Sequence, residues 1–137
     1  MALPKRQRGE EMAGEKILVV DDHKVVCLGF QAELKQEGYD VDIATSGAEA
    51  VEKAKVEKYD LIFIDFVMPE MSGTQTAKAL RGVSPASKLV MMTGQIRKGH
   101  EREETEFFQT AKNVFRLNKP FPPGALAKLA GQALSEK

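Results

Sequence analysis

Three short apolar runs, at residues 17–20, 61–64 and 89–92, constrain the fold of this chain most strongly. Each run is continuously apolar, with no alternation between apolar and polar residues. Such continuity is expected of β-strands that are covered on both faces, as in a parallel sheet between two layers of helices. The runs therefore predict a sheet that is buried in the middle of the molecule.

Two further strands are predicted at residues 41–44 and 114–117, where the pattern includes alternating polar residues, and the first strand is extended to Lys16–Val20. Helical patterns separate the five strands, which predicts an α/β fold built from successive strand–helix units. We expect a doubly wound, five-stranded parallel sheet with helices on both faces. Strands in which apolar and polar residues alternate are expected at the edges of the sheet. The flavodoxin-like strand order 2-1-3-4-5 places the second and fifth strands there.

Local signals predict where the helices begin and end. Gly38 is expected at the end of the first helix, and Pro122 or Pro123 in the first turn of the last helix. The spacing of a capping box occurs in two pairs, Ser46 with Glu49 and Ser72 with Gln75. The last helix is predicted to pack on the protein core through an apolar stripe. This stripe comprises Leu126, Leu129, Ala130, Ala133 and Leu134.

Polar residues stand at the ends of four of these strands. Asp21 and Asp22 follow the first strand, and Asp65 follows the third. Thr93 follows the fourth strand, and Lys119 lies just beyond the fifth. Because the carboxyl ends of parallel strands meet at one edge of the sheet, we expect these side chains to share one crevice.

Carboxylates in one crevice favour a bound cation. Two of them about 4 Å apart repel by roughly 4 kcal/mol at an effective dielectric constant near 20. Mg²⁺ prefers oxygen ligands and takes one or two carboxylates, so Asp21 and Asp22 are predicted to hold it. Asp65 then remains as a nucleophile that can form an aspartyl-phosphate, with Lys119 to neutralise charge and the Thr93 hydroxyl to donate to a phosphoryl oxygen.

Four motifs in this order resemble the receiver domain of bacterial two-component response regulators, over Lys16 to about Leu134. They are Val-Val-Asp21-Asp22, Asp65-Phe-Val-Met-Pro, Met-Met-Thr93-Gly94 and Lys119-Pro120-Phe121. The resemblance implies that Asp65 accepts a phosphoryl group from a histidine kinase or a histidine phosphotransfer protein. It also implies that Asp22 and the carbonyl group of Val67 bind Mg²⁺ directly, that Asp21 binds it through water, and that Asp65 belongs to the same metal site.

The same resemblance implies that Lys119 pairs with the phosphoryl group, that Thr93 is a switch hydroxyl and that the bond before Pro120 is cis. The family usually has an aromatic residue three positions before this lysine, where the chain has Arg116. Phe115 is adjacent, but alternate residues of a strand face opposite sides, so it cannot substitute simply. The usual coupling between threonine and aromatic residue is therefore in question.

A second departure is a segment between Thr93 and Lys119 that is about one helical turn longer than is typical of the family. Its charged stretch, residues 97–106, with Phe107 and Phe108 beneath, is predicted to form an atypical output surface. His100 in this stretch is read as a solvated side chain.

His23 and Cys27 are given no chemical role in this interpretation. His23 adjoins the acid pair and is expected to be a solvated side chain at the start of a helix. Cys27 is expected to be a small buried apolar residue.

The composition of the chain limits its possible partners and cellular location. The chain has 137 residues, enough for one domain, and its 20 basic and 20 acidic residues give zero net charge. No overall field therefore draws nucleic acid or an anionic membrane. A single cysteine excludes an internal disulfide, and no apolar run reaches the ~20 residues of a membrane span, so we expect a cytoplasmic protein.

Residues 1–14 are predicted to be a flexible tail and residues 15–137 a receiver domain, acting alone through protein contacts with an unknown target or through onward phosphotransfer. We expect a monomer or a weak dimer that catalyses only its own phosphorylation and dephosphorylation. A fragment of a longer regulator is an open alternative. Two others are a degenerate receiver that acts as an adaptor and a metal-dependent phosphohydrolase, although Val67 occupies the position where such enzymes carry a second acid.

Overall fold

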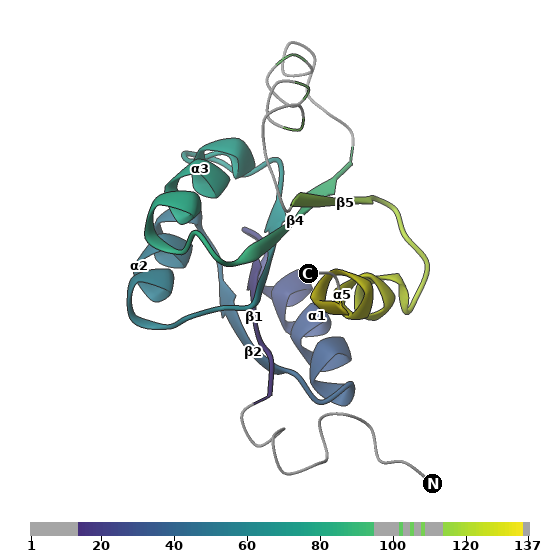
Figure 1. The fold of residues 1–137 in the computed structure, drawn as a ribbon. Coiled ribbons are helices and arrows are strands. Elements are labelled where there is room, and N and C mark those ends of the chain that lie inside the picture. Colours follow the sequence, from purple (N-terminus) through teal and green to yellow (C-terminus); the bar gives the residue numbers. More distant parts are fainter. Residues whose placement is uncertain (1–13, 95–101, 103–104, 106–107, 109–113, 136–137) are drawn as a thin grey trace, which may run out of the picture.

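A parallel sheet in the order β2-β1-β3-β4-β5 forms the centre of the computed structural model, which describes residues 14–94, 102, 105, 108 and 114–135 (Figure 1). The predicted order is confirmed, and so are the edge positions of the second and fifth strands. The predicted strands agree with the structure to within one residue at each end. The strands are β1 (Lys16–Val20), β2 (Asp40–Ala44), β3 (Leu61–Asp65), β4 (Lys88–Thr93) and β5 (Val114–Asn118).

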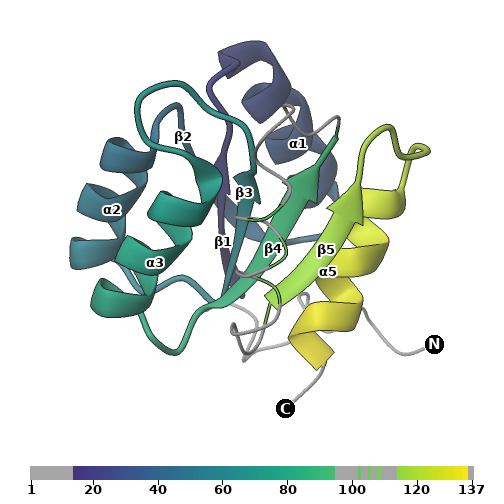
Figure 2. The same ribbon diagram turned by 90° about the horizontal axis from the view of Figure 1, so that it is seen from above.

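Helices cover both faces of the sheet, as Figures 1 and 2 show. Leu18 and Val20 of β1 belong to the apolar cluster beneath one pair of helices, while Ile17 and Val19 belong to the cluster beneath the other pair. Both faces of a central strand are thus buried, which is the physical reason for its continuous apolar run. The first pair is α2 (Gly47–Val56) and α3 (Gly73–Val83), and the second is α1 (Lys24–Gln36) and α5 (Ala125–Ser135).

One of the two predicted capping boxes is complete. The Ser72 side chain accepts from Gln75 N, and the Gln75 side chain accepts from Ser72 N. At the start of α2, Ser46 accepts from Glu49 N as predicted, but the Glu49 carboxylate accepts from Thr45 N at 2.8 Å. The reciprocal bond is therefore displaced by one residue, because the Glu49 side chain reaches back beyond the cap.

The predicted position of the prolines before α5 is wrong. The helix begins at Ala125, so Pro122 and Pro123 precede its first turn. Ala125 N donates to the Pro122 carbonyl oxygen at 3.1 Å, and Gly124 has φ +89°. A turn that requires this left-handed glycine separates the prolines from the helix.

The remaining predictions on the helices hold where the structure describes them. Gly38, with φ +93°, follows the end of α1. Of the stripe on α5, Leu126, Ala130 and Ala133 are fully buried, and Leu129 and Leu134 pack partly against the same cluster.

Parts of two predictions lie outside the described residues. The tail is described only at Gly14, and the charged stretch only at Arg102 and Thr105; His100 and Phe107 are not described. None of the helices in the described part of the chain is long and apolar enough to cross a membrane.

Gly73 allows α3 to begin directly against the end of β3. Its backbone N–H donates to the Phe66 carbonyl oxygen at 2.9 Å. A Cβ atom at Gly73 would lie 2.6 Å from both the Asp65 carbonyl oxygen and Phe66 Cα, closer than such atoms can approach. These contacts are with backbone, so the strand or the helix must move to accommodate any side chain.

We expect Gly73→Ala to lower the free energy of unfolding by about 1–3 kcal/mol, the usual scale of overpacking. Gly82→Ala, in the same helix, is the matched control, because a Cβ atom there meets nothing within 4 Å. That variant should be more stable by about 0.5–1 kcal/mol, since alanine favours helix. Urea denaturation of both variants measures the difference, and equal effects would contradict the close approach at Gly73.

Candidate functional site

Three charged side chains meet at the carboxyl end of the sheet. Asp65 is the last residue of β3, and Lys119 follows β5 directly. Lys119 Nζ lies 3.4 Å from Asp65 Oδ1 and 3.6 Å from Asp21 Oδ2. One ammonium group thus contacts two largely buried carboxylates, which come from different strand ends.

Asp21 and Asp22 meet a third side chain, His23. Asp21 Oδ1 accepts from His23 N at 2.9 Å and lies 3.1 Å from His23 Nδ1. The same Nδ1 atom lies 3.2 Å from Asp22 Oδ1. The prediction that His23 is exposed is correct, since its side chain is 71% exposed, but its contacts with both acids were not predicted. Its position next to the acid pair in the sequence was the available signal.

These residues suit a divalent cation. One potential ligand atom from each of Asp21, Asp22 and His23 lies within 4.8 Å of the other two. Asp21 Oδ2 and Asp22 Oδ1 are buried and make no hydrogen bond. Asp21 Oδ2 contacts Lys119 Nζ and Asp22 Oδ1 contacts His23 Nδ1, but buried carboxylate oxygens that lack a hydrogen bond are costly, and a hard cation would compensate them. Asp65 is not one of these three residues, so its predicted share in metal binding stays a prediction.

Asp65 combines burial with opposing charges. Burial raises the pKa of its carboxyl group, the Lys119 ammonium lowers that pKa, and the Asp21 carboxylate raises it, with a net shift upward. Val67 N donates to Asp65 Oδ1 over a long 3.4 Å. The predicted role of the Val67 carbonyl group as a metal ligand stays a prediction.

Thr93 is buried at the end of β4, and its hydroxyl group bonds to a residue that sequence reasoning missed. Thr93 Oγ1 donates to Asn118 Oδ1 at 2.8 Å. Parallel pairing of β4 with β5 places Thr93 opposite Asn118, so only the strand register reveals this contact. Lys119 N donates to the Thr93 carbonyl oxygen at 2.6 Å, and the Lys119–Pro120 bond is cis, as the resemblance implied.

Arg116 and Phe115 lie on opposite faces of β5, as predicted. Phe115 packs into the cluster beneath α1 and α5. The Arg116 guanidinium lies over the ring of Phe108, 5.1 Å from its centroid. Cys27 is fully buried, as expected, and burial raises the pKa of its thiol to about 11.

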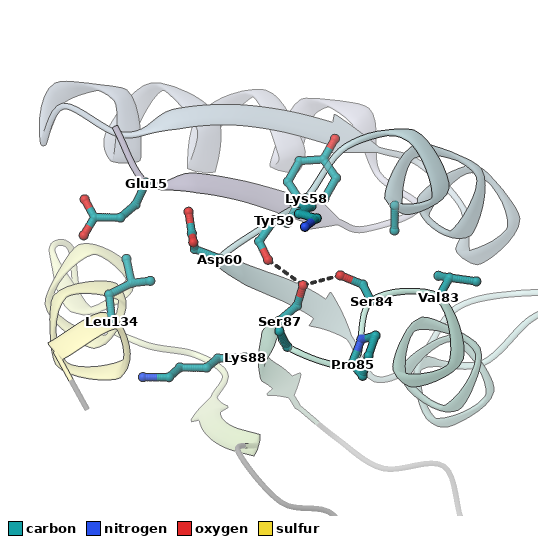
Figure 3. Close-up of a pocket in the computed structure, with 12 residues that line it drawn as sticks. Glu15, Lys58, Tyr59, Asp60, Val83, Ser84, Pro85, Ser87, Lys88 and Leu134 are labelled. Carbon is teal, nitrogen blue, oxygen red and sulfur yellow. Dashed lines mark hydrogen bonds between the residues drawn. The ribbon is translucent and has the colours of Figure 1, made fainter. Parts of the chain in front are cut away.

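A cavity of about 560 Å³ lies at the opposite, amino-terminal end of the sheet (Figure 3). Its lining includes Asp60, just before β3, Lys88, the first residue of β4, and the hydrogen-bonded pair Ser84 and Ser87. Ser87 Oγ also donates to the Tyr59 carbonyl oxygen. The predicted site residues do not line this cavity, so the chemistry of the acidic site is separate from it.

Comparison with known proteins identifies similar domains. The family described as the response regulator receiver domain matches residues 17–130. The chemotaxis protein CheY of Thermotoga maritima is 30% identical over 116 residues, covering 84% of this chain and 93% of that protein. The alkaline phosphatase synthesis transcriptional regulatory protein PhoP of Bacillus subtilis is 35% identical over 109 residues, covering 80% of this chain and 44% of that protein.

Solved structures of similar fold include proteins of the same family. A CheY-like response regulator receiver domain protein from Methanospirillum hungatei has a TM-score of 0.78 at 27% identity, covering 88% of this chain and 94% of the other. The chemotaxis protein CheY4 of Vibrio cholerae has a TM-score of 0.76 at 29% identity, covering 88% and 98%. The chain spans less than half the length of several curated relatives that it matches, such as PhoP.

We expect Asp65→Asn to raise the free energy of unfolding on the order of 1 kcal/mol at pH 7.5 in the absence of metal ions. The upward shift of the pKa means that the folded state disfavours the ionised carboxyl group. Native-state stability from this group is therefore present at low pH and is lost as the pH rises through the folded-state pKa. The advantage of the amide should accordingly shrink as the pH falls through that pKa.

Urea denaturation at several pH values between 4 and 8, with a chelator present, measures this difference. Glu52→Gln is the control, because Glu52 is exposed and pairs with Lys55 within its own helix. An Asp65→Asn variant that is less stable at pH 7.5 would show that attraction to Lys119 outweighs the cost of burial.

Proposed function

Because the chain belongs to the family of response regulator receiver domains, we propose that it is a phosphorylation-controlled signalling switch whose acceptor is Asp65. The observation that carries the proposal is the position of Lys119 Nζ, within 3.6 Å of both the Asp65 and Asp21 carboxylates. An ammonium group beside a carboxylate nucleophile can neutralise charge on a phosphoryl group as it is transferred.

In the proposed reaction a carboxylate oxygen of Asp65 attacks the phosphorus atom of a phosphohistidine. A P–O bond forms as the P–N bond breaks, and the imidazole leaves and takes up a proton. Burial raises the pKa of Asp65, which makes the carboxylate more basic, while Lys119 favours its ionised form. Phosphoryl transfer asks a protein mainly for positioning and charge neutralisation, and the contacts at this site serve both purposes.

Mg²⁺ is the proposed cofactor, with Asp21, Asp22 and Asp65 and the Val67 carbonyl group as its holders. Bound there, it would supply positive charge to neutralise the phosphoryl oxygens, in addition to the charge of Lys119. Support comes from the two buried carboxylate oxygens of Asp21 and Asp22 that make no hydrogen bond. His23 Nδ1 contacts both carboxylates and is a neighbour of the same site.

Receiver domains are typically signalling domains rather than enzymes. The proposed phosphoryl donor is a histidine kinase or a histidine phosphotransfer protein, and the proposed output is contact with a downstream protein or onward transfer. One relative, with 48% identity over 67 residues, is a hybrid signal transduction histidine kinase from Dictyostelium discoideum. Neither the adaptor nor the phosphohydrolase alternative is favoured, and a cytoplasmic location completes the proposal.

We expect Asp65→Asn to abolish labelling by radioactive acetyl phosphate in the presence of Mg²⁺, because the amide lacks a nucleophilic oxygen of comparable strength. Asp60→Asn is the matched control, since Asp60 lies just before the first residue of β3, at the opposite end of that strand from Asp65, and it should be labelled like the wild type. Label retained on Asp65→Asn would refute Asp65 as the acceptor.

We expect Mg²⁺ to stabilise the fold independently of any phosphoryl donor. At ten times its dissociation constant, a ligand that binds only the folded state adds about 1.4 kcal/mol to the free energy of unfolding. Asp22→Asn should require a higher Mg²⁺ concentration for the same increase in melting temperature, whereas Asp60→Asn should behave as the wild type. A melting temperature that does not respond to Mg²⁺ in the wild type would exclude the metal site.

A further inference from the structure

The Thr93 hydroxyl group already donates a hydrogen bond to another side chain of the protein. It has a single proton to donate, and that proton is directed to Asn118 Oδ1 at 2.8 Å. Thr93 is 2% exposed, so water does not readily replace this partner. A phosphoryl group on Asp65 that recruits this hydroxyl must therefore compete with the Asn118 side chain for one proton.

Arg116 holds the acceptor in place. Its Nε–H donates to Asn118 Oδ1 at 3.1 Å and lies 3.4 Å from Thr93 Oγ1, so the three side chains form a closed triangle. In this arrangement Asn118 Oδ1 accepts two hydrogen bonds, one from a charged group. Hydrogen bonds to charged groups are stronger than those between neutral groups, which favours this orientation of the amide.

The same guanidinium group reaches an aromatic stack. It lies 5.1 Å from the centroid of the Phe108 ring, and Phe108 stacks on Phe66 with ring centroids 6.5 Å apart. Phe66 follows Asp65 directly in the sequence. Arg116 therefore contacts the hydroxyl group at the site on one side and a partly buried phenylalanine on the other.

Resting on the proposed function of Asp65, we propose that Asn118 and Arg116 are positioning residues that hold the Thr93 hydroxyl in the unphosphorylated state. Phosphorylation breaks the bond from Thr93 to Asn118, because the Thr93 O–H group then donates its hydrogen bond to a phosphoryl oxygen instead. Asn118 Oδ1 then keeps only the bond from Arg116, and the position of the guanidinium over Phe108 changes with it. An exchange of hydrogen bonds in this chain thus takes the place that the coupling between threonine and an aromatic residue has in the family.

The test compares binding of beryllium fluoride, a phosphoryl mimic, in the presence of Mg²⁺ by calorimetry. Asn118→Ala removes the competing acceptor. We therefore expect beryllium fluoride to bind this variant about three- to tenfold more tightly than the wild type, the change expected for one neutral hydrogen bond. Arg116→Lys moves the donor away from Asn118 and should give a smaller gain. Both residues are exposed, so neither change opens the core.

A second pair of variants separates this mechanism from a general structural effect. In a Thr93→Ala background, Asn118→Ala and Arg116→Lys should each change affinity by less than twofold, because no proton remains to compete for. Gln132→Ala, which removes an exposed amide on α5, is the control and should bind as the wild type. The NMR signal of the Arg116 Nε–H should shift when beryllium fluoride binds to the wild type.

Three outcomes would overturn the proposal. Equal affinity of wild type and Asn118→Ala would show that the acceptor does not compete, and equal affinity of wild type and Arg116→Lys would remove Arg116 from the mechanism. A tightening that persists without the Thr93 hydroxyl would show that Asn118 acts in another way. Failure of the proposed function is distinguishable, because wild type would then neither bind beryllium fluoride nor take label on Asp65.

Discussion

The contact of one ammonium group with two largely buried carboxylates is the interaction on which the site depends. Asp21 and Asp65 come from neighbouring strand ends, and both are withdrawn from water. Burial raises the pKa of the Asp65 carboxyl group, and repulsion from the Asp21 carboxylate raises it further, so both charges need compensation. Lys119 supplies part of that compensation from the end of β5, which is separated from β3 by β4. The parallel order of the strands makes this meeting possible, since each carboxyl end delivers its side chain to the same edge.

The charge at this edge is only partly balanced. Asp21, Asp22 and Asp65 face a single lysine among the ion pairs of the described residues, and His23 contributes positive charge only when protonated. A site of this kind gains from a divalent cation and from any arrangement that spreads negative charge. Stability and the proposed metal binding and phosphoryl acceptance would therefore depend on the same few charges, so a change in one would alter the others.

Sequence patterns predicted the sheet well because burial on both faces requires continuous apolar runs. The prediction of the edge strands was also correct. The residues of β5 are all at least partly exposed, and the polar residues within this strand indicated that exposure. Predictions failed where a few atoms decide between neighbouring arrangements. The prolines before α5 form a turn with Gly124, and Glu49 accepts from Thr45 N, because side-chain reach and turn geometry are not encoded in spacing alone. His23 is exposed, as predicted, but the contacts of its ring with both acids depend on a side-chain rotamer that the sequence does not specify.

The sequence by itself determined the order of the strands, the edge of the sheet where the polar residues stand and the types of side chain available there. These follow from hydrophobic periodicity and from the shared direction of parallel strands. Only the tertiary structure decided which polar atoms pair. The bond from Thr93 to Asn118 and the place of Arg116 over Phe108 depend on the register of β5 against β4 and on side-chain rotamers. Register and rotamer are fixed by packing among residues distant in the chain, so spacing within one segment carries no record of them.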